Sequence, residues 1–420
     1  MGDPPSPVRI DDLVHPRFSP EVQTMVAEAA AFADQVELHE GALTEQAMAE
    51  TGLDDFGDPG FMERLRILTA ALRDEAALSP MGRLSAHAQL LQFLKNRLLV
   101  EEELRRHPEI HDLEVSRPIV ICGLPRTGTT HLHNLISSDP ALRFLPYWES
   151  LEPVLPEAER PAAGEADPRL ARTEAALGII DEAMPYFERM HEMTVGHAHE
   201  EIHLLAIDLS SMYFDTMAPM PSWREWYKAT DQTPHYDYLK TVLKVLQHLR
   251  GGDRWVLKSP QHLEQFGPLA RVFPDATFVV THRDPVSVLT SMLTMLCYSG
   301  RMSHDPVPVG EIVRYWTAVL EDMFRACCED RDLLAASQSL DVRFQDFMAD
   351  DVATVEEVYR LADQPFTGDV RTAMDRFMRE HPRGRHGQVV YEPEQLGLDP
   401  DRLRERFAFY SDHFGVRTEA

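Results

Sequence analysis

Apolar residues in the first 115 positions recur at the three- and four-residue spacing of amphipathic helices. The positions that share this spacing are Phe61, Leu65, Leu68 and Leu72, followed by Leu84, Leu91, Leu94 and Leu98. Ser19-Pro20 and Ser79-Pro80 each place an N-capping serine before a proline, which favours a helix start at the proline. We therefore expect residues 1–115 to form a helical extension, which either packs on the rest of the chain or serves as a dimer or substrate-access element.

From Arg117 onward the pattern changes to short apolar runs, each of which leads through a turn into a helical segment. The runs cover residues 118–122, 254–258, 276–281 and 340–344. Short buried strands that alternate with helices are typical of a parallel sheet in an α/β domain. We predict one such domain over residues 116–420, with ligands bound where the strands end. Residues 153–170, rich in Pro, Ala and Glu, are predicted to form an exposed loop.

The composition limits the classes of ligand that the surface attracts. The 420 residues include 41 Lys and Arg against 69 Asp and Glu, a net charge of −28, which repels nucleic acid and anionic membranes. No apolar stretch approaches the roughly 18 residues of a membrane span, and no signal-peptide pattern opens the sequence. Four irregularly spaced cysteines favour a reducing compartment. We expect a cytoplasmic protein that binds anions through a few arginines and backbone amides.

The first apolar run leads into a segment that favours anion binding. Gly123-x4-Gly128-Thr129-Thr130 has the spacing of a Walker A loop, but Thr129 stands where that loop has its lysine. Such glycines let backbone N–H groups curl around an anion at the positive end of the following helix. Because the lysine that reaches the β- and γ-phosphates is missing, a nucleoside triphosphate is poorly supported. A shorter anion, neutralised by Arg126, fits the segment better.

Residues 124–130, Leu-Pro-Arg-Thr-Gly-Thr-Thr, resemble the loop that binds the 5′-phosphosulfate in sulfotransferases using 3′-phosphoadenosine-5′-phosphosulfate (PAPS). The resemblance is greatest to the bacterial and tyrosylprotein branches, which share Pro-Arg-x-Gly-Thr-Thr, and it covers roughly residues 116–395. It implies a P-loop-NTPase-like α/β fold. It also implies that the 5′ end of the donor is held by Arg126, Thr127, Gly128, Thr129 and Thr130.

The resemblance assigns further donor-binding residues downstream. Arg283 follows the third apolar run, and Ser291 lies eight residues later, the spacing with which these families hold the 3′-phosphate. Residues 342–347 resemble a Tyr-Glu-Asp-Leu segment whose aromatic residue lies near adenine, which points to Phe344. The tryptophan that stacks on adenine in cytosolic relatives is replaced by His131. A basic loop that closes over the 3′-phosphate is expected at Arg383, Gly384 and Arg385.

Sulfuryl transfer needs a base for the acceptor hydroxyl and cations for the leaving oxygen, and it requires no metal. Glu149 lies at the family's separation from Arg126 and follows Tyr-Trp, an apolar setting in which a carboxylate accepts a proton more readily. Lys258 ends the second apolar run, where it resembles the catalytic lysine, and Arg126 adds a second cation. His262, four residues after Lys258, is the alternative base.

A competing hypothesis comes from His199-Glu-Glu-Ile-His203, which spells the HExxH motif of zinc hydrolases. The extended zinc-binding pattern fails, because Ala206 and Leu209 replace the required Gly and His. Two more hypotheses are a nucleotide kinase or NTPase, and a nucleotide-binding protein without activity. Residues 212–227, rich in Met and aromatic side chains, either line an acceptor pocket or pack in the core.

The resemblance implies that PAPS and a small, apolar or aromatic hydroxyl compound react to give a sulfate ester and adenosine 3′,5′-bisphosphate. The expected partners are this small-molecule acceptor and, in a homo-oligomer, further copies of the chain. Neither nucleic acid nor a bound metal is expected.

Overall fold

The structure, a computed structural model, describes residues 5–162 and 164–419 and contains one four-stranded parallel sheet. The strands, in spatial order, are β2 (Val256–Ser259), β1 (Ile119–Cys122), β3 (Thr277–His282) and β4 (Ser339–Arg343). Each of the four apolar runs in the sequence therefore forms a strand, and the predicted α/β fold is confirmed. Because all strands run in the same direction, their carboxyl ends meet at one edge of the sheet.

Side chains alternate between the two faces of each strand, and this alternation divides the sheet between two hydrophobic cores. Ile119 and Ile121 of β1 face the smaller core, whereas Val120 and Cys122 face the larger one. The smaller core is completed by α5 (Thr129–Ser137), α15 (Asp351–Ala362) and α16 (Gly368–Glu380). The larger core includes α10 (Thr233–Arg250), α11 (Phe266–Val272), α12 (Pro285–Ser299) and α13 (Val309–Asp330). Strands covered on both faces account for the uninterrupted apolar runs.

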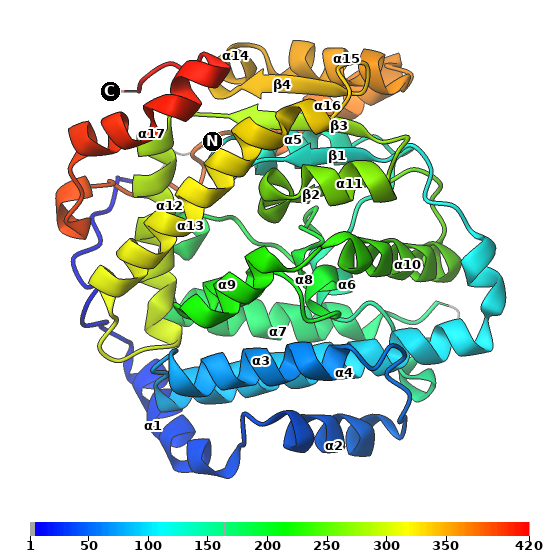
Figure 1. Cartoon of the computed structure of the whole chain (residues 1–420), viewed down its shortest axis with the longest axis vertical. Helices are drawn as coiled ribbons and strands as arrows, with labels where there is room; N and C mark the ends of the chain where they lie inside the picture. The colour runs from blue at the N-terminus through cyan, green and yellow to red at the C-terminus, as the bar shows by residue number, and fades with distance from the viewer. Residues whose placement is uncertain (1–4, 163, 420) are drawn as a thin grey trace.

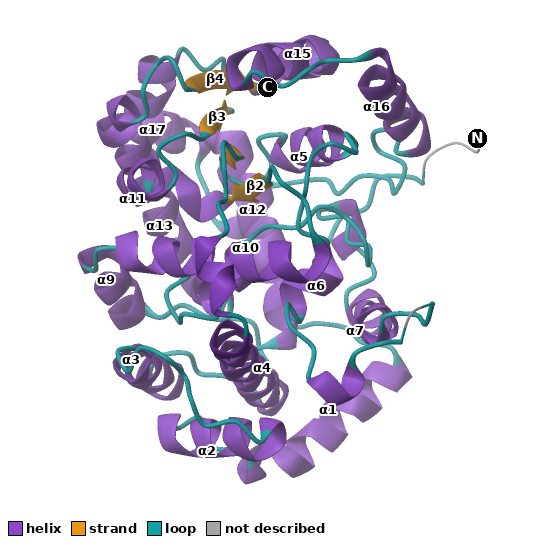
Figure 2. Cartoon of the chain, turned by 90° about the vertical axis from the view of Figure 1, so that its right-hand side faces the viewer, coloured by secondary structure: helices purple, strands orange, loops and turns teal. Residues whose placement is uncertain are grey.

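The N-terminal segment is helical, as its periodicity predicts. It forms α1 (Pro20–Phe32), α2 (Glu40–Thr51), α3 (Phe61–Asp74) and α4 (Pro80–Arg106). Ser19 and Ser79 cap the helices that start at the following prolines, since each hydroxyl accepts a backbone N–H. Figures 1 and 2 place these helices at the opposite end of the molecule from the sheet. Their apolar side chains belong to the larger core, so they pack continuously onto the rest of the chain.

The remaining helices connect and cover these layers. They are α6 (Tyr147–Leu151), α7 (Pro168–Ala183), α8 (Ile202–Ala206), α9 (Pro221–Ala229), α14 (Phe344–Ala349) and α17 (Pro400–Phe414). The predicted exposed loop at residues 153–170 contains a short 3₁₀ turn, but Val154 and Leu155 are buried and the last three residues belong to α7, which begins at Pro168. Within residues 5–162 and 164–419, no helix combines the length and apolar character that a membrane crossing requires.

Candidate active site

The segment between β1 and α5, which the sequence assigns to anion binding, has a constrained backbone. A Cβ atom at Gly123 would lie 1.9 Å from Thr281 Oγ1, so the loop passes too close to β3 for any side chain. Gly128, with φ +87°, turns the chain into α5. Arg126 also has a left-handed backbone, with φ +73°, which costs about 1–2 kcal/mol for a residue with a side chain. Such strain at a helix N-terminus is typical of a functional loop.

A cavity of about 600 Å³ opens beside this loop. Several residues that the sequence assigns to donor binding line it: Arg126, Gly128, Thr129, Thr130, Arg283, Phe344, Arg383, Gly384 and Arg385. Arg189 adds a fifth arginine to the lining. In a chain with a net charge of −28, this concentration of guanidinium groups favours an anionic ligand here.

Arg126 joins the two parts of the chain that were assigned to opposite ends of the donor. Its Nε donates to Ser291 Oγ at 2.8 Å, and its carbonyl oxygen accepts from Arg283 Nη1 at 2.6 Å. The guanidinium of Arg283 also lies 4.0 Å from the ring centre of Phe344. Ser291 is buried in α12 and does not line the cavity. Thr127 is likewise buried, and its hydroxyl bonds Thr281 Oγ1 at 2.7 Å.

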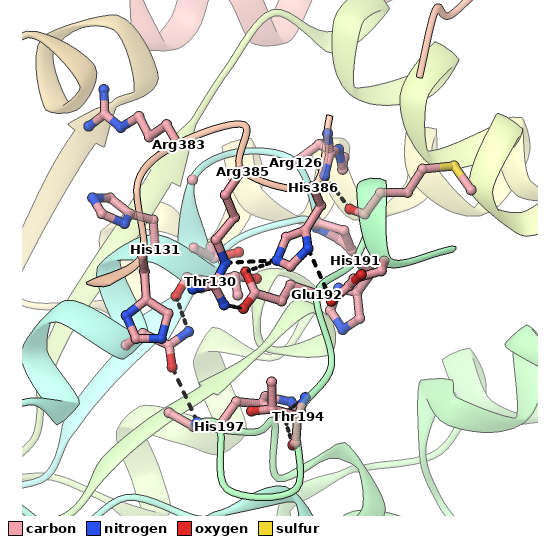
Figure 3. A pocket seen from close by; sticks show the side chains of 18 of the residues that line it. Arg126, Thr130, His131, His191, Glu192, Thr194, His197, Arg383, Arg385 and His386 are labelled. Carbon is pink, nitrogen blue, oxygen red and sulfur yellow. Dashed lines mark hydrogen bonds and ion pairs between the residues drawn. The ribbon is translucent and has the colours of Figure 1, made fainter. Parts of the chain in front are cut away.

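The basic loop at residues 383–386 closes one side of the cavity, and carboxylates hold its cations. Arg383 Nη2 donates to Asp351 Oδ2 at 3.0 Å. Arg385 pairs with Glu192, and His386 Nε2 lies 3.2 Å from the same carboxylate. Figure 3 shows Arg385 and His386 converging on Glu192. The predicted phosphate-binding cations are therefore present and already paired within the protein.

Glu149 does not line the cavity, and the apolar setting expected for it is wrong. Its side chain is fully buried, where Oε2 accepts from Arg143 Nη2 at 2.5 Å and Oε1 accepts from Arg250 Nη1 at 3.0 Å. A carboxylate whose two oxygens both serve guanidinium groups is occupied as a structural ion pair. His262, the alternative base, is also fully buried and absent from the lining, and it bonds Glu201 and Tyr236.

Lys258 does not itself line the cavity and meets the lining through Glu200, a residue to which the resemblance to sulfotransferases assigns no role. The Nζ of Lys258 donates to the carboxylate of Glu200, and Glu200 lines the cavity. The ammonium group is almost completely buried, whereas Glu200 retains 15% of its side-chain exposure. Glu200 belongs to the HExxH string, and no spacing rule in the sequence connects it to a lysine 58 residues later.

The HExxH string does not form the helical zinc site that its letters suggest. His199 precedes α8, which starts at Ile202, so the two histidines do not lie one turn apart on a helix. His199 Nδ1 instead bonds the Nε2 of His197, which lines the cavity. In the part of the chain that the structure describes, three metal-ligating side chains gather only at His107, Glu109 and His248, outside the lining.

Burial keeps the histidines near the cavity neutral. It lowers the pKa of His197 to about 4 and that of His191 to about 3, with the nearby Lys258 charge adding to the effect. The pKa of His203 is also lowered to about 4, first by burial and then by His197. Neutral imidazoles beside a buried ammonium avoid repulsion between like charges.

The Met- and aromatic-rich segment at residues 212–227 packs in the core. Met212, Phe214, Trp223 and Tyr227 are almost completely buried, and none of them lines the cavity. The apolar part of the lining comes from other elements and includes Phe144, Met190, Met295 and Phe377.

Comparison with known proteins identifies curated relatives that are named as sulfotransferases. A curated relative in Mycobacterium bovis, omega-hydroxy-beta-dihydromenaquinone-9 sulfotransferase Stf3, is 23% identical over 253 residues. The match covers 58% of this chain and 62% of that protein. A relative of the same name in Mycobacterium tuberculosis gives the same values. The chain thus matches less than two thirds of the length of these relatives.

Two solved structures match over nearly their whole length. Sulfotransferase STF1 from Mycobacterium tuberculosis is 28% identical with a TM-score of 0.76, over 87% of this chain and 97% of its own. Sulfotransferase STF9 from Mycobacterium avium shares the fold, with 24% identity and a TM-score of 0.80 over 91% and 98% of the two chains. The profile described as "Sulfotransferase family" matches residues 118–368, more than half of the sequence and all four strands. The chain therefore belongs to the sulfotransferase family.

Proposed function

We propose that this protein transfers the sulfuryl group of PAPS to the hydroxyl of a small, apolar or aromatic acceptor. Members of the family generally use PAPS as donor. The observation that carries the proposal is the junction at Arg126, which bonds Ser291 through its side chain and Arg283 through its carbonyl. An anion loop and a second set of cations therefore face one cavity, as a ligand with a phosphate at each end of its ribose requires.

In this proposal the 5′-phosphosulfate lies against the loop from Gly123 to Thr130, at the N-terminus of α5. Backbone N–H groups and the positive end of the helix favour negative charge there. Arg283 and the loop of Arg383 and Arg385 bind the 3′-phosphate, and the buried Ser291 holds the side chain of Arg126. Guanidinium groups suit this role because they donate two parallel hydrogen bonds to one phosphate. Phe344, which lies against Arg283 and lines the cavity, is the aromatic residue that we place beside adenine.

We assign the base to Glu200 instead of Glu149. Glu200 lines the cavity and contacts the ammonium of Lys258, whereas Glu149 is buried between two arginines. The Glu200 carboxylate takes the proton of the acceptor hydroxyl while the hydroxyl oxygen forms a bond to the sulfur. The bond from sulfur to the 5′-phosphate oxygen breaks, and that oxygen keeps the electron pair. Arg126, which lines the cavity, and Lys258, buried behind Glu200, supply the positive charge that offsets the charge developing on the transferring group and the leaving oxygen.

The acceptor class follows from the apolar side of the cavity and from the relatives. Phe144, Met190, Met295 and Phe377 give an apolar lining beside the polar loop, which suits a hydrophobic alcohol or phenol. The curated relatives are named for a hydroxylated menaquinone derivative. We propose an acceptor of that chemical kind, an apolar molecule that carries one accessible hydroxyl.

Ligand-induced stabilisation tests the donor assignment. A ligand that binds only the native state raises the melting temperature by mass action. We expect adenosine 3′,5′-bisphosphate to raise it by several degrees, and ATP with Mg²⁺ to have a much smaller effect because the loop lacks the Walker lysine. Adenosine 5′-monophosphate is the matched control for the second phosphate. Stabilisation by ATP–Mg²⁺ without stabilisation by the bisphosphate would contradict the proposal.

A further inference from the structure

The geometry points to a positioning role for Glu201. Together with His262 and Tyr236, it holds the Glu200–Lys258 pair in place. This inference rests on the proposed function, which makes Glu200 the base and Lys258 the cation. Two consecutive glutamates reach the same lysine from different sides. Glu200 contacts the side-chain ammonium, and Glu201 Oε2 accepts the backbone N–H of Lys258 at 2.8 Å.

The backbone contact completes the outer edge of the sheet, which is buried. β2 is an edge strand and pairs only with β1. Alternate N–H groups of β2 point away from β1, and each of these needs an acceptor from outside the sheet. Val256 N–H donates to the carbonyl oxygen of Arg143 at 2.8 Å. The next N–H on that side belongs to Lys258, and Glu201 accepts it with a side chain in place of another strand. The end of β2 is thus fixed to the segment that carries the base.

The other oxygen of Glu201 continues into a buried chain of hydrogen bonds. Oε1 contacts Nε2 of His262, and Nδ1 of His262 lies 2.8 Å from the hydroxyl of Tyr236. Glu201, His262 and Tyr236 are all fully buried. A tautomer with its hydrogen on Nε2 accepts from Tyr236 at Nδ1 and donates to Glu201, so one tautomer satisfies every bond of the series. His262 lies in the 3₁₀ turn Pro260–Glu264, which follows β2. Glu201 therefore contacts both the end of the strand and the turn after it.

The burial of these three residues distinguishes their positioning role from direct participation in catalysis. Glu201, His262 and Tyr236 do not line the cavity, so none of them contacts the reacting atoms. Their effect on turnover passes through the placement of Glu200 and Lys258. A displacement of about 1 Å in a catalytic group can cost 100-fold in rate while the donor still binds. Glu201, the middle residue of the HExxH string, therefore has a positioning role, because it fixes the strand end that carries Lys258.

The test measures turnover and donor binding separately, in the full-length protein, for Glu201→Ala, Glu201→Gln and Tyr236→Phe. Tyr227→Phe is the control, because Tyr227 is an equally buried tyrosine outside this hydrogen-bonded series. Rates are normalised to the number of sites that bind adenosine 3′,5′-bisphosphate, so misfolded molecules are not counted. We expect kcat to fall about 100-fold in Glu201→Ala, with KM for PAPS and the Kd of the bisphosphate changed less than about twofold.

Glu201→Gln keeps an oxygen that accepts the Lys258 N–H, so we expect it to recover most of the loss, to within about 10-fold of the parent. Tyr236→Phe should lower kcat about threefold or more, and Tyr227→Phe should leave it unchanged. If Glu201→Ala does not fold, Glu201→Gln and Tyr236→Phe still decide the question by the same comparison.

Two results would overturn the inference: normalised kcat values equal to the parent in the Glu201 variants, or parallel losses of bisphosphate affinity and kcat, which indicate a merely structural role. Failure of the proposed function is recognised differently, because the parent protein itself would then transfer no sulfuryl group from PAPS.

Discussion

Glu419 binds Arg283 through two parallel hydrogen bonds, from Nε to Oε1 at 2.8 Å and from Nη2 to Oε2 at 2.7 Å. The backbone N–H of Glu419 also donates to Asp284 Oδ2 at 2.7 Å. Carboxylate and phosphate groups present similar pairs of oxygens to a guanidinium group. The C-terminal segment therefore occupies the arginine that we assign to the 3′-phosphate.

We predict that Glu419→Gln tightens the binding of adenosine 3′,5′-bisphosphate about 3- to 10-fold, because the phosphate no longer competes with a carboxylate for Arg283. Both side chains are about one fifth exposed, so solvent screens the pair and the effect stays modest. Isothermal titration calorimetry at fixed ionic strength measures the change. Glu405→Gln, an exposed position on α17, serves as the control. An unchanged Kd in Glu419→Gln would show that the pair does not compete with the donor.

The variants Glu200→Gln and Glu149→Gln distinguish the proposed catalytic role of Glu200 from the structural role of Glu149. Glu200→Gln should reduce kcat at least 1,000-fold, since it removes the proton acceptor, while bisphosphate binding persists. Glu149→Gln should lower the free energy of unfolding by about 3 kcal/mol, because it leaves the largely buried guanidinium group of Arg143 without its charge partner. Its rate per bisphosphate-binding site should equal that of the parent.

Chemical denaturation and steady-state kinetics on both variants provide the comparison. A fully active Glu200→Gln protein, together with an inactive but stable Glu149→Gln protein, would return the base to Glu149.

Gly123→Ala tests the close approach of the loop to β3. The added methyl group would meet Thr281 Oγ1 at 1.9 Å, and overpacking of this kind costs about 1–3 kcal/mol. We expect a lower melting temperature and weaker bisphosphate binding, since Thr281 holds Thr127 of the loop. Thr281→Ala in the same protein should restore part of the stability.

The matched control is Gly178→Ala in α7, where an added Cβ meets nothing within 4 Å. Alanine at that helical position should stabilise the protein slightly. Equal melting temperatures for the two glycine variants would contradict the steric argument.

The strands could be predicted because both faces of this sheet are buried, which makes the runs around Val120 and Val279 continuously apolar. The turn between β1 and α5 could be predicted because its glycines lie close together at a recognisable spacing, although the steric demand at Gly123 comes from the distant Thr281. The surroundings of Glu149 could not be predicted from its neighbours in the sequence. Tyr147 and Trp148 beside it suggested an apolar setting, but Arg250, which follows it by 101 residues, folds onto its carboxylate.

The sequence did not point to Glu200 as a residue of the cavity, because its contact also joins distant segments of the chain. Its partner Lys258 lies on a strand that the fold brings alongside, and no periodicity in the sequence encodes that contact. The surrounding letters matched a zinc motif, whose histidines need a helix that starts earlier than Ile202. Contacts between distant segments, here at the edge of β2, decide which polar residues meet.

Stability should depend on pH through His203. The folded pKa is about 4, below the ordinary histidine value of 6.5, so as the pH falls the unfolded chain takes up the proton first. The contribution of His203 is therefore complete above about pH 6.5 and is lost as the pH falls towards 4. His203→Gln should reduce the slope of unfolding free energy against pH in that range by about 1.4 kcal/mol per unit. Urea denaturation at several pH values measures it, and an unchanged slope would contradict the burial of a neutral imidazole.

The central claim is tested most directly with PAPS labelled in its sulfuryl group and a hydrophobic phenol or alcohol as acceptor. We predict that the label moves to the acceptor as a sulfate ester, with one equivalent of adenosine 3′,5′-bisphosphate formed per ester and no transfer by Glu200→Gln. A protein that binds the bisphosphate but moves no label to any hydroxyl acceptor, or a Glu200→Gln protein that transfers at the parent's rate, would contradict the account.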